Sequence, residues 1–151
     1  MQAFDTFLKI INGYFSAQTA YAHCDIPCGI YTSQSAETAA ATVARMAEKI
    51  LALPADGSSE EMLKIRNDFV RMVMVKEEHA QICKKELLML WTDYFKEEHL
   101  KMFPNLHETF WKAAKLCSQN KQNVSMDLAR KLQEAVHEIG HMFSEAEKTK
   151  K

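Results

Sequence analysis

Residues 23–31, with the sequence HCDIPCGIY, place two thiols, an imidazole and a carboxylate close together. Cys24 and Cys28 are four residues apart, but Pro27 and Gly29 disfavour a helix, so we expect the segment to fold as a tight hook. Thiolates are soft ligands that select copper, zinc, nickel or iron–sulfur centres over hard cations. The hook is therefore a candidate metal site.

The other two cysteines do not complete that site. A structural zinc site needs four ligands, commonly a second cysteine or histidine pair at similar spacing. Cys83 and Cys117 instead lie singly within long helical patterns, where a cysteine is usually a small buried hydrophobic residue. The hook must draw its remaining ligands from elsewhere, and its own backbone is the nearest source.

Cleavage before the hook would supply a backbone ligand. Residues 1–22 end in Ala20-Tyr21-Ala22, a small-x-small triplet of the kind that processing proteases cut after. If the segment is removed as a propeptide, His23 gains a free α-amine with a pKa near ~7.7–8.0. That amine, the amide nitrogen of Cys24 and the sulfurs of Cys24 and Cys28 make four donors in a plane, which low-spin Ni(II) or Cu(II) prefers. The imidazole of His23 can then reach an axial position. The alternative is an uncut amphipathic helix that packs on the body.

The rest of the chain predicts a small helical protein. Of 151 residues 47% are hydrophobic, glycine (4) and proline (3) are scarce, and the formal net charge is -1. That balance disfavours a nucleic-acid partner, and no apolar run approaches the ~20 residues of a membrane span. Scarce glycine also disfavours sheet architectures with many turns.

Apolar residues recur at three- and four-residue steps in four segments. We expect helices from Ser35 to about residue 51, from a capping box at Ser58 and Glu61 to about Trp91, over 106–117, and after Ser125. Residues 118–123 are expected to form a loop. Short connections between amphipathic helices predict an all-α fold, an antiparallel up-down four-helix bundle. The expected organisation is a propeptide at 1–22, the hook at 23–31, the bundle at 32–148 and a solvated tail at 149–151.

The hook resembles the mature N-terminus of nickel superoxide dismutases, His-Cys-Asp-x-Pro-Cys-Gly-x-Tyr. Residues 90–96, LWTDYFK, are similar to a second block of that family, Leu-Trp-x-Asp-Tyr-Phe-Lys. The resemblance covers about residues 23–148. It implies disproportionation of superoxide to oxygen and hydrogen peroxide, with one nickel ion per subunit that cycles between Ni(II) and Ni(III). It also implies a homohexamer and a protease that removes residues 1–22.

The resemblance also assigns roles to single residues. It implies that His23, Cys24 and Cys28 hold the nickel ion, and that Pro27 sets the turn, through a cis peptide bond. Tyr31 and Tyr94 are expected to line the approach to the open axial face, Asp25 to help hold the hook, and Lys96 to steer the anionic substrate. Some members of the family are expected to carry an arginine near the axial histidine where this chain has His79. His79 or Glu37 is then the candidate hydrogen-bond partner of His23.

Two other functions stay open. His137-Glu138-x-x-His141 matches the zinc-hydrolase motif, but the extended pattern would want glycine and histidine where Ser144 and Glu147 stand. A non-catalytic helical module that binds metal is the third possibility.

His99 and His107 are expected to be surface or interface histidines. The leader, which has no net charge, favours the cytoplasm, while the Ala-Tyr-Ala triplet leaves export or an organelle open.

Overall fold

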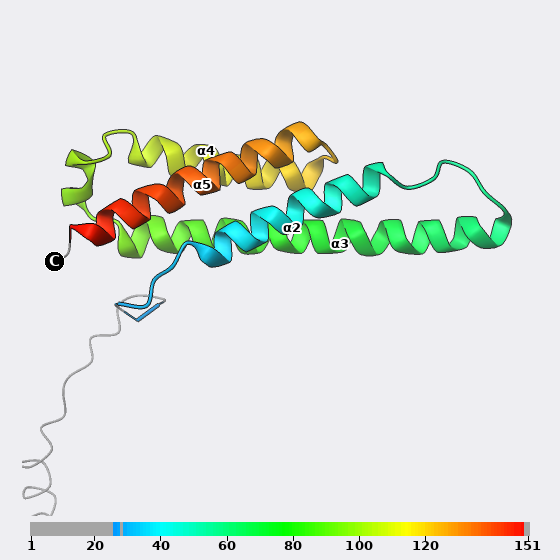
Figure 1. Cartoon of the computed structure of the whole chain (residues 1–151), viewed down its shortest axis with the longest axis horizontal. Helices are drawn as coiled ribbons and strands as arrows, with labels where there is room; N and C mark the ends of the chain where they lie inside the picture. Colours follow the sequence, from blue (N-terminus) through cyan, green and yellow to red (C-terminus); the bar gives the residue numbers. More distant parts are fainter. Residues whose placement is uncertain (1–25, 28, 150–151) are drawn as a thin grey trace, which may run out of the picture.

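The computed structural model describes residues 26–27 and 29–149 and contains four long helices in this part of the chain (Figure 1). Helix α2 spans Gln34–Leu51, α3 spans Ser59–Met89, α4 spans Leu106–Gln122 and α5 spans Met126–Lys148. A π-helical turn, η1, spans Leu90–Tyr94, and a 3₁₀ turn, η2, spans Glu97–Lys101. The predicted all-α fold is confirmed.

The four helices run alternately up and down, and each packs against two neighbours (Figure 1). Helix α2 lies between α3 and α5, and α4 closes the ring between the same two helices. The N-terminal part of α3 projects beyond α4 and α5, and there it has only the end of α2 and the connection from α2 to α3 beside it (Figure 1). No helix in the described part of the chain is long and apolar enough to cross a membrane.

Helix α3 begins where the sequence predicts. The Ser58 backbone N–H donates to Glu61 Oε2 at 2.8 Å, and the Glu61 N–H donates back to Ser58 Oγ at 3.4 Å. These bonds satisfy backbone donors that the first turn of a helix leaves without partners. Hydrogen bonds from Ser58 also lower the pKa of the Glu61 carboxyl group.

Helix α3 does not end as a regular helix. After Met89 the backbone widens into the π-helical turn, in which the Phe95 N–H donates to the Leu90 carbonyl at 3.0 Å. The extra residue in this turn changes which side chains face the core, a feature that often marks functional sites. Leu90, Tyr94 and Phe95 are all buried there.

The prediction of a loop over residues 118–123 is wrong, because α4 continues to Gln122. Polar residues in this stretch suggested a solvated connection, but Asn120 is buried. Its side-chain amide donates to the carbonyls of Leu116 at 2.9 Å and Leu128 at 3.0 Å. The asparagine thus joins α4 to the start of α5 instead of ending the helix.

A buried lysine binds the same end of α4. Lys76 lies inside α3 with 1% of its surface exposed. Its ammonium group donates to the Asn120 carbonyl and to those of Lys121 at 3.2 Å and Asn123 at 3.1 Å. These carbonyls lie at the negative end of the helix dipole, where a cation is favourable. Burial lowers the pKa of Lys76, and the Glu77 carboxylate counteracts that shift.

We expect Lys76→Met to destabilise the bundle by about 2 kcal/mol, because the carbonyls at the end of α4, that of the buried Asn120 among them, lose a charged donor. Urea unfolding of the purified variant measures this loss. Lys85, at an exposed position of the same helix, provides the control. Lys85→Met should leave the free energy of unfolding almost unchanged, as surface substitutions usually do. Equal stability of the two variants would contradict the role given to Lys76.

Candidate functional site

The four hook residues His23, Cys24, Asp25 and Cys28 lie outside the described residues. The described part of the hook contains a turn. The Ile30 N–H donates to the Pro27 carbonyl at 3.4 Å, and Gly29 has a φ of +93°. A positive φ favours glycine, so this position explains the glycine of the motif.

The expectation of a cis bond at Pro27 is wrong. Among the peptide bonds of residues 26–27 and 29–149, none is cis. The positive φ of Gly29 and the bond from Ile30 to Pro27 reverse the chain here without one.

Tyr31 and Tyr94 meet although they lie far apart in the sequence. Their ring centroids are separated by 5.6 Å, with an interplanar angle of 58°. Tyr31 is the last residue of the hook, and Tyr94 closes the π-helical turn. The two tyrosines named from the sequence therefore meet where the hook ends.

Other aromatic rings hold Tyr94 in position. Phe143 of α5 lies 4.5 Å away between centroids, Phe95 makes an edge contact at 5.0 Å, and the His99 ring is stacked at 5.9 Å. Tilted and edge contacts of this kind are the favourable geometries for aromatic pairs. Only 4% of the surface of Tyr94 is exposed, so the packing around the ring fixes its position beside Tyr31.

The hydroxyl of Tyr94 donates to Glu147 Oε1 at 2.5 Å. Burial of the ring, and after it the bond and the negative charge of Glu147, raise the pKa of the Tyr94 phenol above its ordinary value. Tyr94 therefore stays a neutral phenol over the whole physiological range.

The prediction that His99 lies at a surface or interface is wrong, since only 4% of it is exposed. Its Nδ1 accepts the Lys96 backbone N–H at 2.9 Å and so starts the 3₁₀ turn η2. The ring contacts both Tyr94 and Phe95. The sequence signal for this burial is a histidine at the third position of the short turn, where its ring accepts the N–H that precedes the turn.

Lys96 lines a different hollow from the tyrosine pair. Its exposed side chain borders a space of about 340 Å³ together with Trp91 and His107, and neither Tyr31 nor Tyr94 lines that space. Trp91 stacks on Phe110 at 5.8 Å and donates to His107 Nδ1 at 2.8 Å, which fits the expected packing role of this tryptophan.

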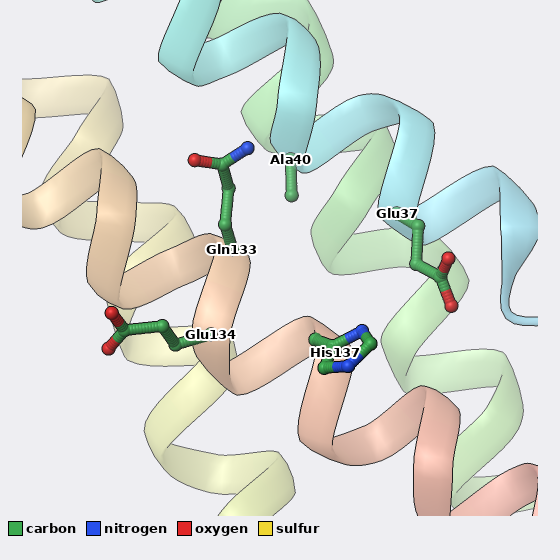
Figure 2. A pocket seen from close by; sticks show the side chains of 5 residues that line it. All are labelled: Glu37, Ala40, Gln133, Glu134 and His137. Atoms are coloured by element: carbon green, nitrogen blue, oxygen red, sulfur yellow. The ribbon is translucent and has the colours of Figure 1, made fainter.

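Glu37 of α2 lines a hollow of about 410 Å³ between α2 and α5, together with Gln133, Glu134 and His137 of α5 (Figure 2). It accepts a hydrogen bond from Ser33 Oγ at 2.8 Å, close to the point where the hook segment enters α2. Gly140 of α5 makes room for this carboxylate, because a Cβ there would lie 2.5 Å from Glu37 Oε1.

His79, the other candidate partner of the axial histidine, is half-buried on α3. Its Nδ1 bonds to the Val75 carbonyl at 2.9 Å within the same helix. Because a carbonyl only accepts, Nδ1 carries the hydrogen and Nε2 of the neutral ring keeps a lone pair. As a hydrogen-bond partner of the His23 imidazole, His79 would offer the lone pair of Nε2, whereas Glu37 would offer a charged carboxylate.

The zinc-hydrolase motif does not form a metal site in the described residues. His137 and His141 are exposed on α5, and no three His, Cys, Asp or Glu side chains of the described chain come close enough to hold a metal. Three protein ligands are the usual minimum for catalytic zinc.

Cys83 and Cys117 are fully buried, as expected. Cys83 of α3 and Cys117 of α4 contact each other, and this contact together with burial raises the pKa of the Cys83 thiol. These cysteines are part of the core.

Comparisons with known proteins agree with the resemblance in the sequence. The profile of nickel-containing superoxide dismutases matches residues 18–148. A nickel superoxide dismutase of Streptomyces seoulensis is 32% identical over 127 residues, which are 84% of this chain and 89% of that protein. One from Streptomyces coelicolor is 29% identical over 130 residues, which cover 86% of this chain and 92% of that protein.

Solved structures give the same result. A crystal structure of a nickel-containing superoxide dismutase, with nickel ligation corresponding to the oxidised state, has a TM-score of 0.71 and 32% identity. A native nickel superoxide dismutase structure has a TM-score of 0.70 and 28% identity. Each alignment covers 83% of this chain and 99% of the other.

The raised pKa of Tyr94 predicts how stability depends on alkaline pH. Above about pH 10 the unfolded chain releases this phenolic proton while the folded chain keeps it, so unfolding becomes easier as pH rises. The wild type should therefore lose stability more steeply than Tyr94→Phe, by up to about 1 kcal/mol per pH unit.

Urea unfolding of both proteins between about pH 9 and pH 11.5 measures the difference in their free energies of unfolding. Groups that titrate in the same way in both proteins do not contribute to this difference. Parallel stability curves would contradict the raised pKa.

Proposed function

The chain belongs to the nickel-containing superoxide dismutase family, and we propose that it disproportionates superoxide at a nickel ion held by the hook, residues 23–31. The observation that carries this proposal is the contact between Tyr31, the last residue of the hook, and Tyr94. It supports a site at the end of the bundle where the hook enters α2.

The donor chemistry of the hook fits nickel. We propose that the ligands are the α-amine and imidazole of His23, the amide nitrogen and sulfur of Cys24 and the sulfur of Cys28. Anionic thiolate and amidate donors raise electron density at the metal, so nickel supplies one-electron chemistry between Ni(II) and Ni(III) when bound. One ion per subunit follows from one hook per chain. The turn at Pro27 and Gly29 supports the close approach of the two thiolates.

The tyrosine gate, which we define as Tyr31 and Tyr94, has two tasks in this proposal. Its rings narrow the approach so that only small anions enter, and the hydroxyl group of Tyr31 passes protons toward the peroxide that forms. Tyr94 stays a neutral phenol, so it adds no negative charge that would repel the anionic substrate. A narrow entrance also protects the thiolates from oxidation by peroxide.

Three further residues have supporting roles in the proposal. Asp25 helps to hold the hook, and Glu37 accepts a hydrogen bond from the imidazole of His23. We prefer Glu37 to His79 because its carboxylate lies beside Ser33, near the chain entry into α2, and a charged acceptor gives the stronger bond. Lys96 attracts superoxide from a distance, since its side chain lines a neighbouring hollow and not the gate.

We also propose assembly into a homohexamer. Leu63, Val70 and Met74 of α3 are each more than half exposed, and their spacing puts them on one helix face. This face lies in the N-terminal half of α3, and the first part of that helix projects past α4 and α5 (Figure 1). Exposed apolar rows of this kind are typical of contact surfaces, and a second copy of the chain is the occupant that we expect.

Maturation by a protease that removes residues 1–22 completes the proposal, with the mature enzyme in the cytoplasm. The zinc-hydrolase alternative has no third ligand in the described residues to support it.

Substitution of single cysteines tests the nickel site. We expect Cys24→Ser and Cys28→Ser each to abolish nickel binding and to lower superoxide turnover at least about 100-fold, because a hydroxyl is a poor ligand for nickel. Cys83→Ala and Cys117→Ala are matched controls. They should lose about 1–2 kcal/mol of stability but keep one nickel ion per chain. Nickel content by elemental analysis and turnover by pulse radiolysis are the measurements. Nickel retained by Cys24→Ser would refute the ligand set.

Blocking the α-amine tests the need for cleavage. A chain with one extra alanine before His23 has the same hook side chains but an amide in place of the amine, so it should bind nickel much more weakly and be inactive. Native mass spectrometry measures the nickel content and the number of subunits in the same spectrum, for this chain and for a chain that begins at His23. The mature chain should appear as a hexamer with six nickel ions. Equal nickel content in both chains would show that the amine is not a ligand.

A further inference from the structure

The hydrogen bond between Tyr94 and Glu147 joins the gate to the end of the chain. Glu147 lies in the last turn of α5 and is exposed, while the phenol that it binds is almost fully buried. A bond between a phenol and a carboxylate is charge-assisted, so it is stronger than one between neutral groups. No motif in the sequence marks Glu147 as part of the site.

Helix α5 contacts Tyr94 at two points. Phe143 packs against the ring at 4.5 Å between centroids, and Glu147 binds the hydroxyl at 2.5 Å. These two residues lie one turn apart on the same helix face. Ala146 is fully buried, and the Thr149 hydroxyl donates to the Ala146 carbonyl at 2.8 Å, so the last turn of α5 is itself held in place. A firmly held helix end is able to fix a side chain of another element.

We propose that Glu147 is a positioning residue of the tyrosine gate, whose carboxylate fixes the Tyr94 hydroxyl and occupies its hydrogen. The inference rests on the proposed function, in which Tyr31 and Tyr94 form that gate. It adds a residue from the opposite end of the chain to the control of anion entry.

The consequence for anions follows from the single hydrogen of a phenol. While Tyr94 donates to Glu147, this hydrogen is not available to an anion that lodges at the gate. The negative charge of Glu147 also disfavours a resident anion beside it. Ionisable side chains that contact Tyr94 include Tyr31 from the segment before α2, His99 from η2 and Glu147 from α5. Glu147 is the carboxylate that binds the Tyr94 hydroxyl.

Glu147→Gln tests the proposal with the size of the side chain preserved. The amide oxygen still accepts from Tyr94, but the bond becomes neutral and weaker, so azide should inhibit the nickel-loaded mature enzyme about fivefold more tightly. In a separate titration before nickel loading, the ultraviolet absorbance of the Tyr94 phenolate should appear at lower pH than in wild type. Subtraction of the Tyr94→Phe titration assigns this signal.

Glu145→Gln is the matched control. It removes the same charge from the same turn of α5, but Glu145 pairs with Lys148 at 2.6 Å instead of with Tyr94. We expect wild-type azide inhibition and a wild-type Tyr94 titration. The inference is overturned if Glu147→Gln and Glu145→Gln behave alike in both measurements while turnover stays normal.

A failure of the proposed function gives a different experimental result. If the nickel-loaded mature wild type does not disproportionate superoxide, that function and the gate role of Glu147 are both wrong, whatever the variants do. Normal wild-type turnover with no effect of Glu147→Gln refutes the positioning role alone.

Discussion

The position of Tyr94 is the constraint on which the candidate site depends. Its ring must lie beside Tyr31, yet no short segment of the chain brings the two together. The π-helical turn at the end of α3 places Tyr94 in the core, and Phe95 and His99 support the ring from the same connection. The remaining supports, Phe143 and Glu147, come from α5. The proposed gate, Tyr31 and Tyr94, thus depends on contacts among three separated parts of the bundle.

Polar groups in the core join these parts. Lys76 of α3 binds the carbonyl end of α4, and Asn120 of α4 binds the start of α5. Such groups are costly to bury unless every donor finds an acceptor, so each one favours a single arrangement of its two helices. The helix that leads into Tyr94 is therefore connected through α4 to the helix that carries Glu147.

The metal ligands and the scaffold make different demands on the chain. The proposed ligands need only a short segment with a free amine, which local chemistry specifies almost completely. Protection of that segment needs walls of fixed shape, and only packed helices supply them. This division explains why Cys83 and Cys117 are poor candidates for the metal despite their thiols. They contact each other in the core, where the pKa of Cys83 is raised and its thiol stays protonated.

The sequence alone determined the features that depend on neighbours along the chain. The capping box at Ser58, the approximate helix boundaries and the turn at Gly29 follow from local hydrogen bonding and backbone preference, and the hook motif named the family. The predicted end of α4 and the predicted exposure of His99 are wrong. A polar side chain usually indicates contact with solvent, but Asn120 and His99 form their hydrogen bonds with partners inside the fold.

Only the tertiary structure decided which distant residues meet. No pattern in the sequence relates Glu147 to Tyr94, since a helical period shows which residues share a face but not what that face contacts. The same holds for Lys76 and the end of α4 and for Glu37 opposite Gly140. These contacts depend on how the helices pack, which is set by the shape of the whole core and not by any one segment.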